Sequence, residues 1–95
     1  MINNIQYNNL GTVNQNEVII EDWKGGRFVL SFSYRTLVGI SWHKGEKYGK
    51  AIIQNYWSAT TGKLLNKLEP DKKKRLERED FDQEVVRMFK QINKR

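Results

Sequence analysis

The clearest pattern in the chain is an alternation of large apolar and polar residues that starts at position 28. Phe28, Leu30, Phe32 and Tyr34 are large and apolar, and the residues between them are polar except for Val29. A period of two is typical of a β-strand with one buried face. The sequence therefore predicts a strand here, with the even positions, Tyr34 included, facing the core.

Three further strands are expected around this one. β-Branched residues indicate a strand at 17–23, and two adjacent glycines at 25–26 favour a hairpin turn after it. Apolar residues indicate a third strand at 37–42 and a short fourth strand at 51–54. The connections are too short for parallel crossovers, so the strands form an antiparallel meander.

Residues 1–16 are polar and contain six asparagines among a few scattered apolar positions. This composition suits either a polar N-terminal arm or a leading fifth strand. We expect one α+β domain over residues 17–95, since no internal repeat or second domain is visible.

The periodicity changes to that of a helix at Ser58, whose hydroxyl is suited to cap the first helical turn. The apolar positions that follow recur at i, i+3, i+4 and i+7, the spacing of one helix face: Thr61, Leu64, Leu65 and Leu68. Trp57, just before the cap, is expected to be buried and to anchor this helix on the sheet.

A second helix is predicted to start at Asp80, a capping residue with Gln83 three positions later. Its apolar stripe is expected to face the core: Phe81, Val85, Met88, Phe89 and Ile92. The predicted fold is an α+β domain with a four- to five-stranded antiparallel sheet and two C-terminal helices packed on one face.

Composition narrows the class of protein. The 95 residues allow one small domain, and the aromatic share of 12% is that of a globular rather than a disordered chain. The first residues lack a secretory signal, and no apolar run approaches the length needed to cross a bilayer. We therefore expect a soluble, cytoplasmic protein with no membrane partner.

Candidate catalytic and metal chemistry is sparse. The chain has no cysteine, and His43 is its single histidine, so we expect neither a metal site nor a bound cofactor. Thr61, Gly62 and Lys63 suggest a phosphate loop, but Trp57 and Leu64 stand where that motif requires glycine and a hydroxyl residue. The sequence predicts a protein that is not an enzyme.

Positive charge is concentrated in the last third of the chain. Residues 63–95 hold eleven basic and seven acidic residues, which is four of the net six positive charges. We predict a basic ridge that binds a partner or nucleic acid, made of Lys63, Lys67, Lys72, Lys73, Lys74, Arg75 and Arg78. Its side chains are expected to be exposed, so that charge reversal at Lys73 and Arg75 would leave stability nearly unchanged. The alternative is that the run is only a solvated linker.

Two aromatic residues near turns, Trp23 and Tyr48, are expected to be exposed contact residues. A large aromatic side chain presents much contact area at a small entropic cost.

Two segments resemble a small domain family carried by bacteriophages and other mobile elements. They are residues 33–39, read as SYRTLVG, and residues 57–66, read as WSATTGKLLN. Members of that family are mostly of unassigned function. Leu64 stands where the family pattern has a histidine, so no role of that histidine transfers.

The resemblance implies a phage-type accessory protein. We therefore expect a non-enzymatic protein that binds a host protein or nucleoprotein complex and modulates or inhibits it, as anti-defence proteins do. The alternative is a small basic protein that binds DNA or RNA, since each neutralised phosphate releases condensed counterions.

Overall fold

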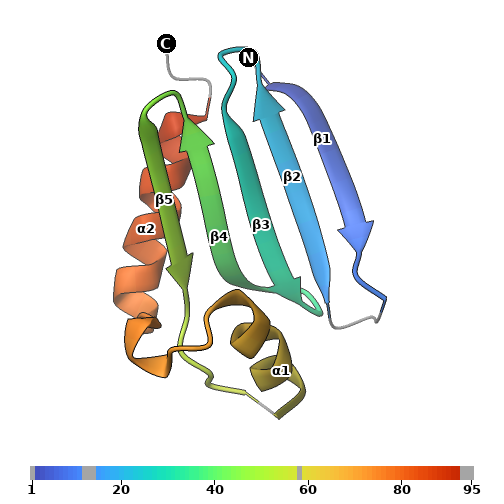
Figure 1. The fold of residues 1–95 in the computed structure, drawn as a ribbon, viewed down its shortest axis with the longest axis vertical. Coiled ribbons are helices and arrows are strands. Elements are labelled where there is room, and N and C mark those ends of the chain that lie inside the picture. The colour runs from blue at the N-terminus through green and yellow to red at the C-terminus, as the bar shows by residue number, and fades with distance from the viewer. Residues whose placement is uncertain (1, 12–14, 58, 93–95) are drawn as a thin grey trace.

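The five strands form one antiparallel sheet in their order along the chain (Figure 1). The structure is a computed structural model that describes residues 2–11, 15–57 and 59–92. The strands are β1 (Ile2–Asn9), β2 (Asn16–Asp22), β3 (Arg27–Ser33), β4 (Thr36–Lys44) and β5 (Lys47–Ile52). They are followed by α1 (Ala59–Leu68), the 3-10 helix η1 (Lys72–Lys74) and α2 (Arg78–Gln91). The predicted α+β class is confirmed, and the leading segment is a fifth strand rather than an arm.

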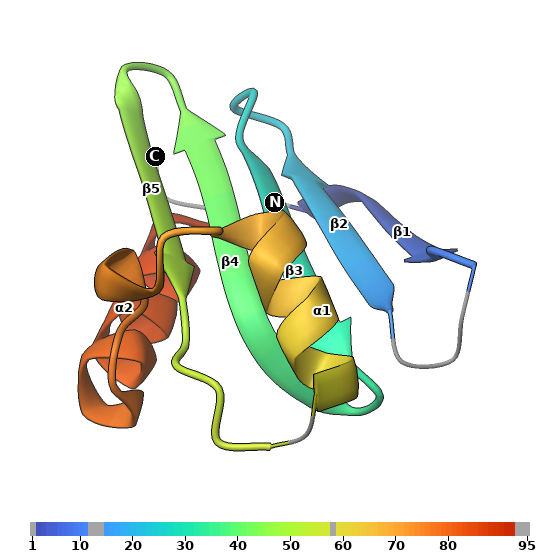
Figure 2. The ribbon, with the colours of Figure 1, turned by 60° about the horizontal axis from the view of Figure 1, so that its bottom comes forward.

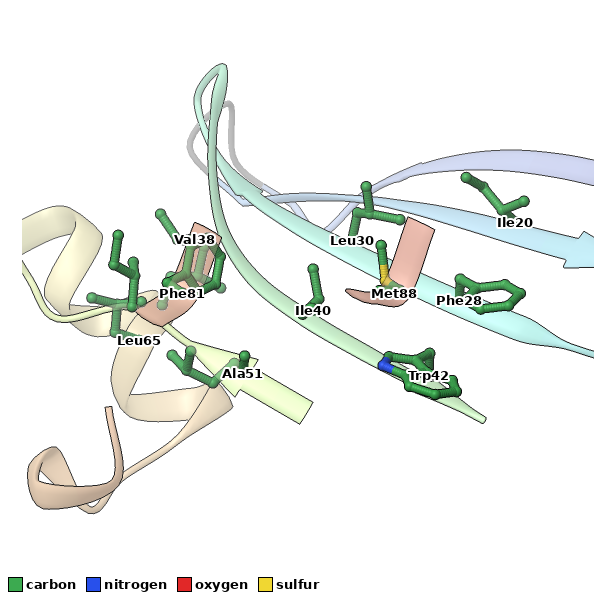
Figure 3. Close-up of a cluster of buried hydrophobic side chains, with 13 residues drawn as sticks. Ile20, Phe28, Leu30, Val38, Ile40, Trp42, Ala51, Leu65, Phe81 and Met88 are labelled. Carbon is green, nitrogen blue, oxygen red and sulfur yellow. The ribbon is translucent and has the colours of Figure 1, made fainter. Parts of the chain in front are cut away.

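The main core lies between α2 and one face of the sheet. Across β3 and β4, Phe28 pairs with Trp42 and Leu30 pairs with Ile40, and all four side chains are buried on this face. The Phe28 and Trp42 rings stack with centroids 6.0 Å apart. Phe81 and Met88 of α2 pack into the same cluster (Figure 3). The alternating apolar residues of the sequence therefore correctly identify the buried face of β3. Phe89 of α2 is 48% exposed, so the prediction that it faces the core is wrong.

Helix α1 packs on the other face, at the end of the sheet where β3 turns into β4. Gly39 and Ile40 are neighbours in β4 and so point to opposite faces. A Cβ atom on Gly39 would lie 3.1 Å from Leu68 Cδ1 of α1. The Ser33 and Thr61 hydroxyls are 2.8 Å apart and hydrogen-bonded. Both helices were predicted to pack on one face, whereas α1 lies in front of the sheet and α2 behind it (Figure 2).

The tight turn after β3 contains Tyr34, which was predicted to face the core. Strand β3 ends at Ser33, and Tyr34 has a φ of 56° and is 55% exposed. The chain reverses direction within two residues here, and such a tight turn requires a positive φ. Tyr34 is therefore part of the turn, and its side chain does not follow the alternation of the strand. The prediction that Tyr34 faces the core is therefore wrong.

Two element boundaries also differ from expectation. Strand β5 begins at Lys47, because residues 47–52 pair with β4 directly after the turn. Helix α2 begins at Arg78, with Glu77 as the N-cap residue, and the Glu77 carbonyl accepts the Phe81 N–H at 2.9 Å. Asp80 therefore lies within the first turn and is not the cap. The predicted cap of α1, Ser58, lies outside the described residues.

A buried ion pair joins three elements at the end of the sheet far from α1. Asp22 accepts hydrogen bonds from the backbone N–H groups of Lys24 (3.0 Å) and Gly26 (2.8 Å), which shapes the turn between β2 and β3. Its other oxygen is 2.7 Å from Lys44 Nζ. Lys44 also donates to the carbonyl of Gln91 at 2.8 Å and so fixes the end of α2.

Within residues 2–11, 15–57 and 59–92, no helix is long and apolar enough to cross a membrane.

Candidate functional site

The end of the molecule formed by α1, η1 and the start of α2 gathers most of the predicted basic residues. We call it the basic–aromatic end and define it by its cations and two aromatic residues: Lys63, Lys67, Lys72, Lys73, Lys74, Arg75, Arg78, Tyr56 and Trp57. In Figure 2 this end is turned toward the viewer.

Three consecutive lysines of this end are held in a single 3-10 turn. Asp71 caps the turn, because its side chain accepts the backbone N–H of Lys73 at 3.0 Å. The carbonyl of Asp71 also accepts the N–H of Lys74 at 3.0 Å. Lys72, Lys73 and Lys74 are all exposed, and a turn of three residues directs successive side chains to different sides.

Arg75, at the end of this run, is structural rather than exposed. The residue is only 5% exposed. Its guanidinium donates from Nε to the carbonyl of Glu69 at 3.1 Å and from one Nη to the side chain of Asn66 at 2.6 Å. Both acceptors lie at the end of α1, where backbone carbonyls lack helical partners. The expectation that Arg75 is a free surface charge is wrong, because packing between α1 and η1 buries it.

Arg75 and Leu76 are also hydrogen-bonded to the end of the sheet. The N–H of Leu76 donates to the carbonyl of Ile52 at 2.8 Å, and the N–H of Gln54 donates to the carbonyl of Leu76 at 2.8 Å. The Gln54 side chain donates to the carbonyl of Arg75 at 2.8 Å. These bonds attach η1 rigidly to β5, so its lysines have a defined place.

A cavity of about 530 Å³ opens between these elements. It is lined by Gln54, Asn55, Gly62, Lys63, Asn66, Lys72 and Arg75. The lining joins three cationic side chains with three amides and includes no carboxylate. Such groups suit a ligand with negative charge and with hydrogen-bonding edges.

Two aromatic rings and an arginine lie beside the lysines. Arg78 Cζ lies 5.9 Å from the ring centroid of Tyr56 and 5.8 Å from that of Trp57. The two rings meet edge to face, with centroids 5.9 Å apart. The backbone N–H of Arg78 donates to the Tyr56 hydroxyl at 3.3 Å.

Trp57 was predicted to be a buried anchor of α1, and the structure contradicts this. It is 39% exposed and Tyr56 is 53% exposed, so Trp57 is not a buried anchor for α1. That role falls to Leu64 and Leu65, which are fully buried. Tyr56 and Trp57 were not predicted as contact residues, since their partner Arg78 is more than twenty positions away and no local spacing joins them.

The acidic residues nearest the lysines have partners of their own. Glu69 lies 3.9 Å from Lys50 of β5. Asp71 caps η1 through its side chain. Lys67 turns toward the β1–β2 connection, where its Nζ donates to the side chain of Gln15 at 2.9 Å. Positive charge at this end is therefore only partly compensated.

The two predicted aromatic contact residues lie at the opposite end of the sheet. Trp23 is in the β2–β3 turn and Tyr48 is at the start of β5, and both are exposed as expected. The Trp23 indole N–H donates to the side chain of Asn3 at 2.8 Å. They do not form one site with the lysines.

His43 is exposed on β4, and in the part of the chain that the structure describes no three histidine, aspartate or glutamate side chains are grouped to hold a metal ion.

Comparison with known families gives one match. A family described as "Family of unknown function (DUF8033)" matches residues 1–83. The chain belongs to this family. The matched region of this DUF8033 chain covers all five strands, α1, η1 and the first turn of α2, so the whole basic–aromatic end is within it. No curated protein and no solved structure matches the chain.

Proposed function

We propose that the chain is a non-enzymatic binding module that engages single-stranded nucleic acid through its basic–aromatic end. The observation that supports this most is the position of Arg78 over the half-exposed rings of Tyr56 and Trp57, beside a carboxylate-free cavity. Proteins that bind single strands combine a cationic track for the backbone with aromatic rings on which bases stack.

Each group has a distinct part in this proposal. The exposed lysines of η1, together with Lys63, contact phosphates and release counterions. Trp57 and Tyr56 offer ring faces and edges to unstacked bases, and Arg78 orients both rings. The amides of Gln54 and Asn66 supply donors and acceptors at the cavity for the edge of a base.

The cellular partner we propose is a host nucleoprotein complex in the cytoplasm whose exposed strand this end captures. The resemblance to domains of phages and mobile elements supports an accessory role that modulates or inhibits such a complex. The exposed Trp23 and Tyr48, at the other end of the sheet, support a second contact, with the protein part of the complex.

The proposal is tested by the fluorescence anisotropy of a labelled single-stranded oligonucleotide at two salt concentrations. A single strand gives a log–log slope of about −0.7 per neutralised phosphate, so contacts by Lys63 and the three lysines of η1 predict a slope of about −3. Between about 50 mM and 200 mM salt, the affinity should fall about 50-fold.

A matched pair of variants distinguishes this site from a general effect of charge. Lys63→Glu with Lys72→Glu should weaken binding about 10-fold or more at low salt and reduce the slope. Lys24→Glu with Lys47→Glu makes the same charge change at the opposite end and should alter affinity only slightly. Equal losses in both pairs, or no binding at low salt, would contradict the proposal.

A further inference from the structure

The two edges of the sheet are protected to different degrees. The end of β5 is covered, because Leu76 pairs with it through the two backbone hydrogen bonds to Ile52 and Gln54. The rest of β5 carries Lys47 and Lys50, and lysines on an edge strand discourage pairing with another chain. Strand β5 is therefore protected against pairing with a strand of another chain.

Among the residues that the structure describes, neither protection is found on β1, whose one irregularity is a register shift between Ile2 and Asn4. The strand is eight residues long, INNIQYNN, and contains no charged residue and no proline. Its only neighbour in the sheet is β2, and nearly all of its residues are exposed. A long, uncharged edge of this kind is a template for another strand. It lies within the region that the family match covers, so it is part of the family's domain.

The register shows which backbone groups of β1 are unpaired. The N–H of Leu10 donates to the carbonyl of Gln15 at 2.8 Å, so this pair is hydrogen-bonded. In an antiparallel ladder such pairs alternate with pairs whose backbone groups point away from the partner strand. Gln6, opposite Ile19, therefore points to β2, while Ile5 and Tyr7 point their N–H and C=O groups outward.

The outward-pointing residues are also the apolar ones. Ile5 and Tyr7 are 61% and 64% exposed. They pair with Ile20 and Val18, so their side chains lie on the sheet face that carries the main core. The other face of β1 presents amides. The Asn4 and Asn8 side chains donate to Glu21 and Glu17 at 3.2 Å and 3.1 Å.

We propose that β1 pairs antiparallel with β1 of a second copy of this chain, about a twofold axis at Gln6. In this register Ile5 faces Tyr7 of the second copy, Tyr7 faces Ile5, and Asn4 faces Asn8. Apolar residues thus meet apolar residues, and amides meet amides. Centring the axis on Ile5 or on Tyr7 would instead oppose an apolar side chain to an asparagine.

The self-complementary pattern of β1 favours a second copy as the occupant, and the charge of the chain confines the contact to this strand. Each chain carries a net charge of +6, so two copies repel one another over most of their surface. Strand β1 is the neutral part of that surface, and there the backbone of two copies can approach closely. The product is one sheet of ten strands, five from each copy, with the basic–aromatic ends at its two opposite ends. This inference does not depend on nucleic-acid binding.

Sedimentation equilibrium over a concentration series tests the pairing. The chain of 11.3 kDa should approach twice that mass as concentration rises. Ile5→Lys with Tyr7→Lys places new ammonium groups opposite one another across the axis and should weaken dimerisation about 10-fold or more. Tyr48→Lys with Val86→Lys adds the same charge at exposed positions elsewhere and should leave the dimer nearly intact. A protein that stays monomeric throughout, or a dimer that the β1 variant leaves unchanged, would overturn the proposal.

A cysteine variant gives a second test that leaves the apolar residues in place. The natural chain has no cysteine, so Gln6→Cys introduces a single thiol at the proposed axis. Facing residues of a non-hydrogen-bonded antiparallel pair are close enough for a disulfide. Under mild oxidation this variant should form a cross-linked dimer much faster than Tyr48→Cys, which is also at an exposed position, on the other edge strand. Equal rates would refute the register.

Discussion

Arg75 offers the sharpest test of how the basic–aromatic end is built. Arg75→Ala removes two hydrogen bonds from a charged donor, at 3.1 Å to Glu69 and 2.6 Å to Asn66. Bonds of this kind contribute about 1.5 to 3 kcal/mol each, and acceptors that regain water recover part of the loss. Because Asn66 is exposed and Glu69 is half-buried, we expect a net loss of about 2 to 3 kcal/mol. For a chain of this size that corresponds to a fall in Tm of about 10 to 20 °C.

The assay is urea denaturation followed by circular dichroism, with a lysine variant and a neighbouring residue as controls. Arg75→Lys keeps the charge but loses the planar fork, so it should lose about half as much stability. Lys73→Ala, at an exposed position in the same run, should change stability by less than about 0.5 kcal/mol. If Arg75→Ala were as stable as Lys73→Ala, Arg75 would be a surface charge and the structural role assigned to it would be refuted.

Three further substitutions test the roles of individual residues, the first in both binding and stability and the other two in stability. Trp57→Ala should lose only about 1 kcal/mol of folding free energy because the ring is half-exposed, while oligonucleotide affinity, followed by anisotropy, should fall about 10-fold. Asp22→Ala leaves the mostly buried Lys44 without its carboxylate and should cost about 3 to 5 kcal/mol in a urea titration. Gly49→Ala would bring a Cβ within 2.8 Å of the Trp42 ring, so a loss of about 1 to 3 kcal/mol and a change in tryptophan fluorescence are expected.

The sheet was largely predictable because its signals are local. In β3 the alternation of Phe28, Leu30 and Phe32 arises from the two-residue period of a strand, and short connections exclude a parallel sheet. Tyr34 could not be placed in this way. Its exposure follows from a positive φ in the turn, which the pattern of apolar residues does not encode.

The candidate site was only partly predictable, since its contacts join distant segments. The basic residues were identified from composition, but the sequence alone does not show that Lys73 and Arg75 differ in burial. Only the approach of α1 to η1 buries Arg75 and leaves Lys73 exposed. The grouping of Tyr56 and Trp57 with Arg78 likewise depends on how the chain returns to the end of β5.

The central claim, that the basic–aromatic end binds nucleic acid, is tested most directly by mapping amide chemical shifts of the ¹⁵N-labelled protein as a single-stranded oligonucleotide is added. We expect the largest changes to cluster in the connection before α1, along α1, and from η1 to Arg78, with the β2–β3 turn unaffected. Changes confined to the turns around Trp23 and Tyr48, or no changes at low salt, would contradict it.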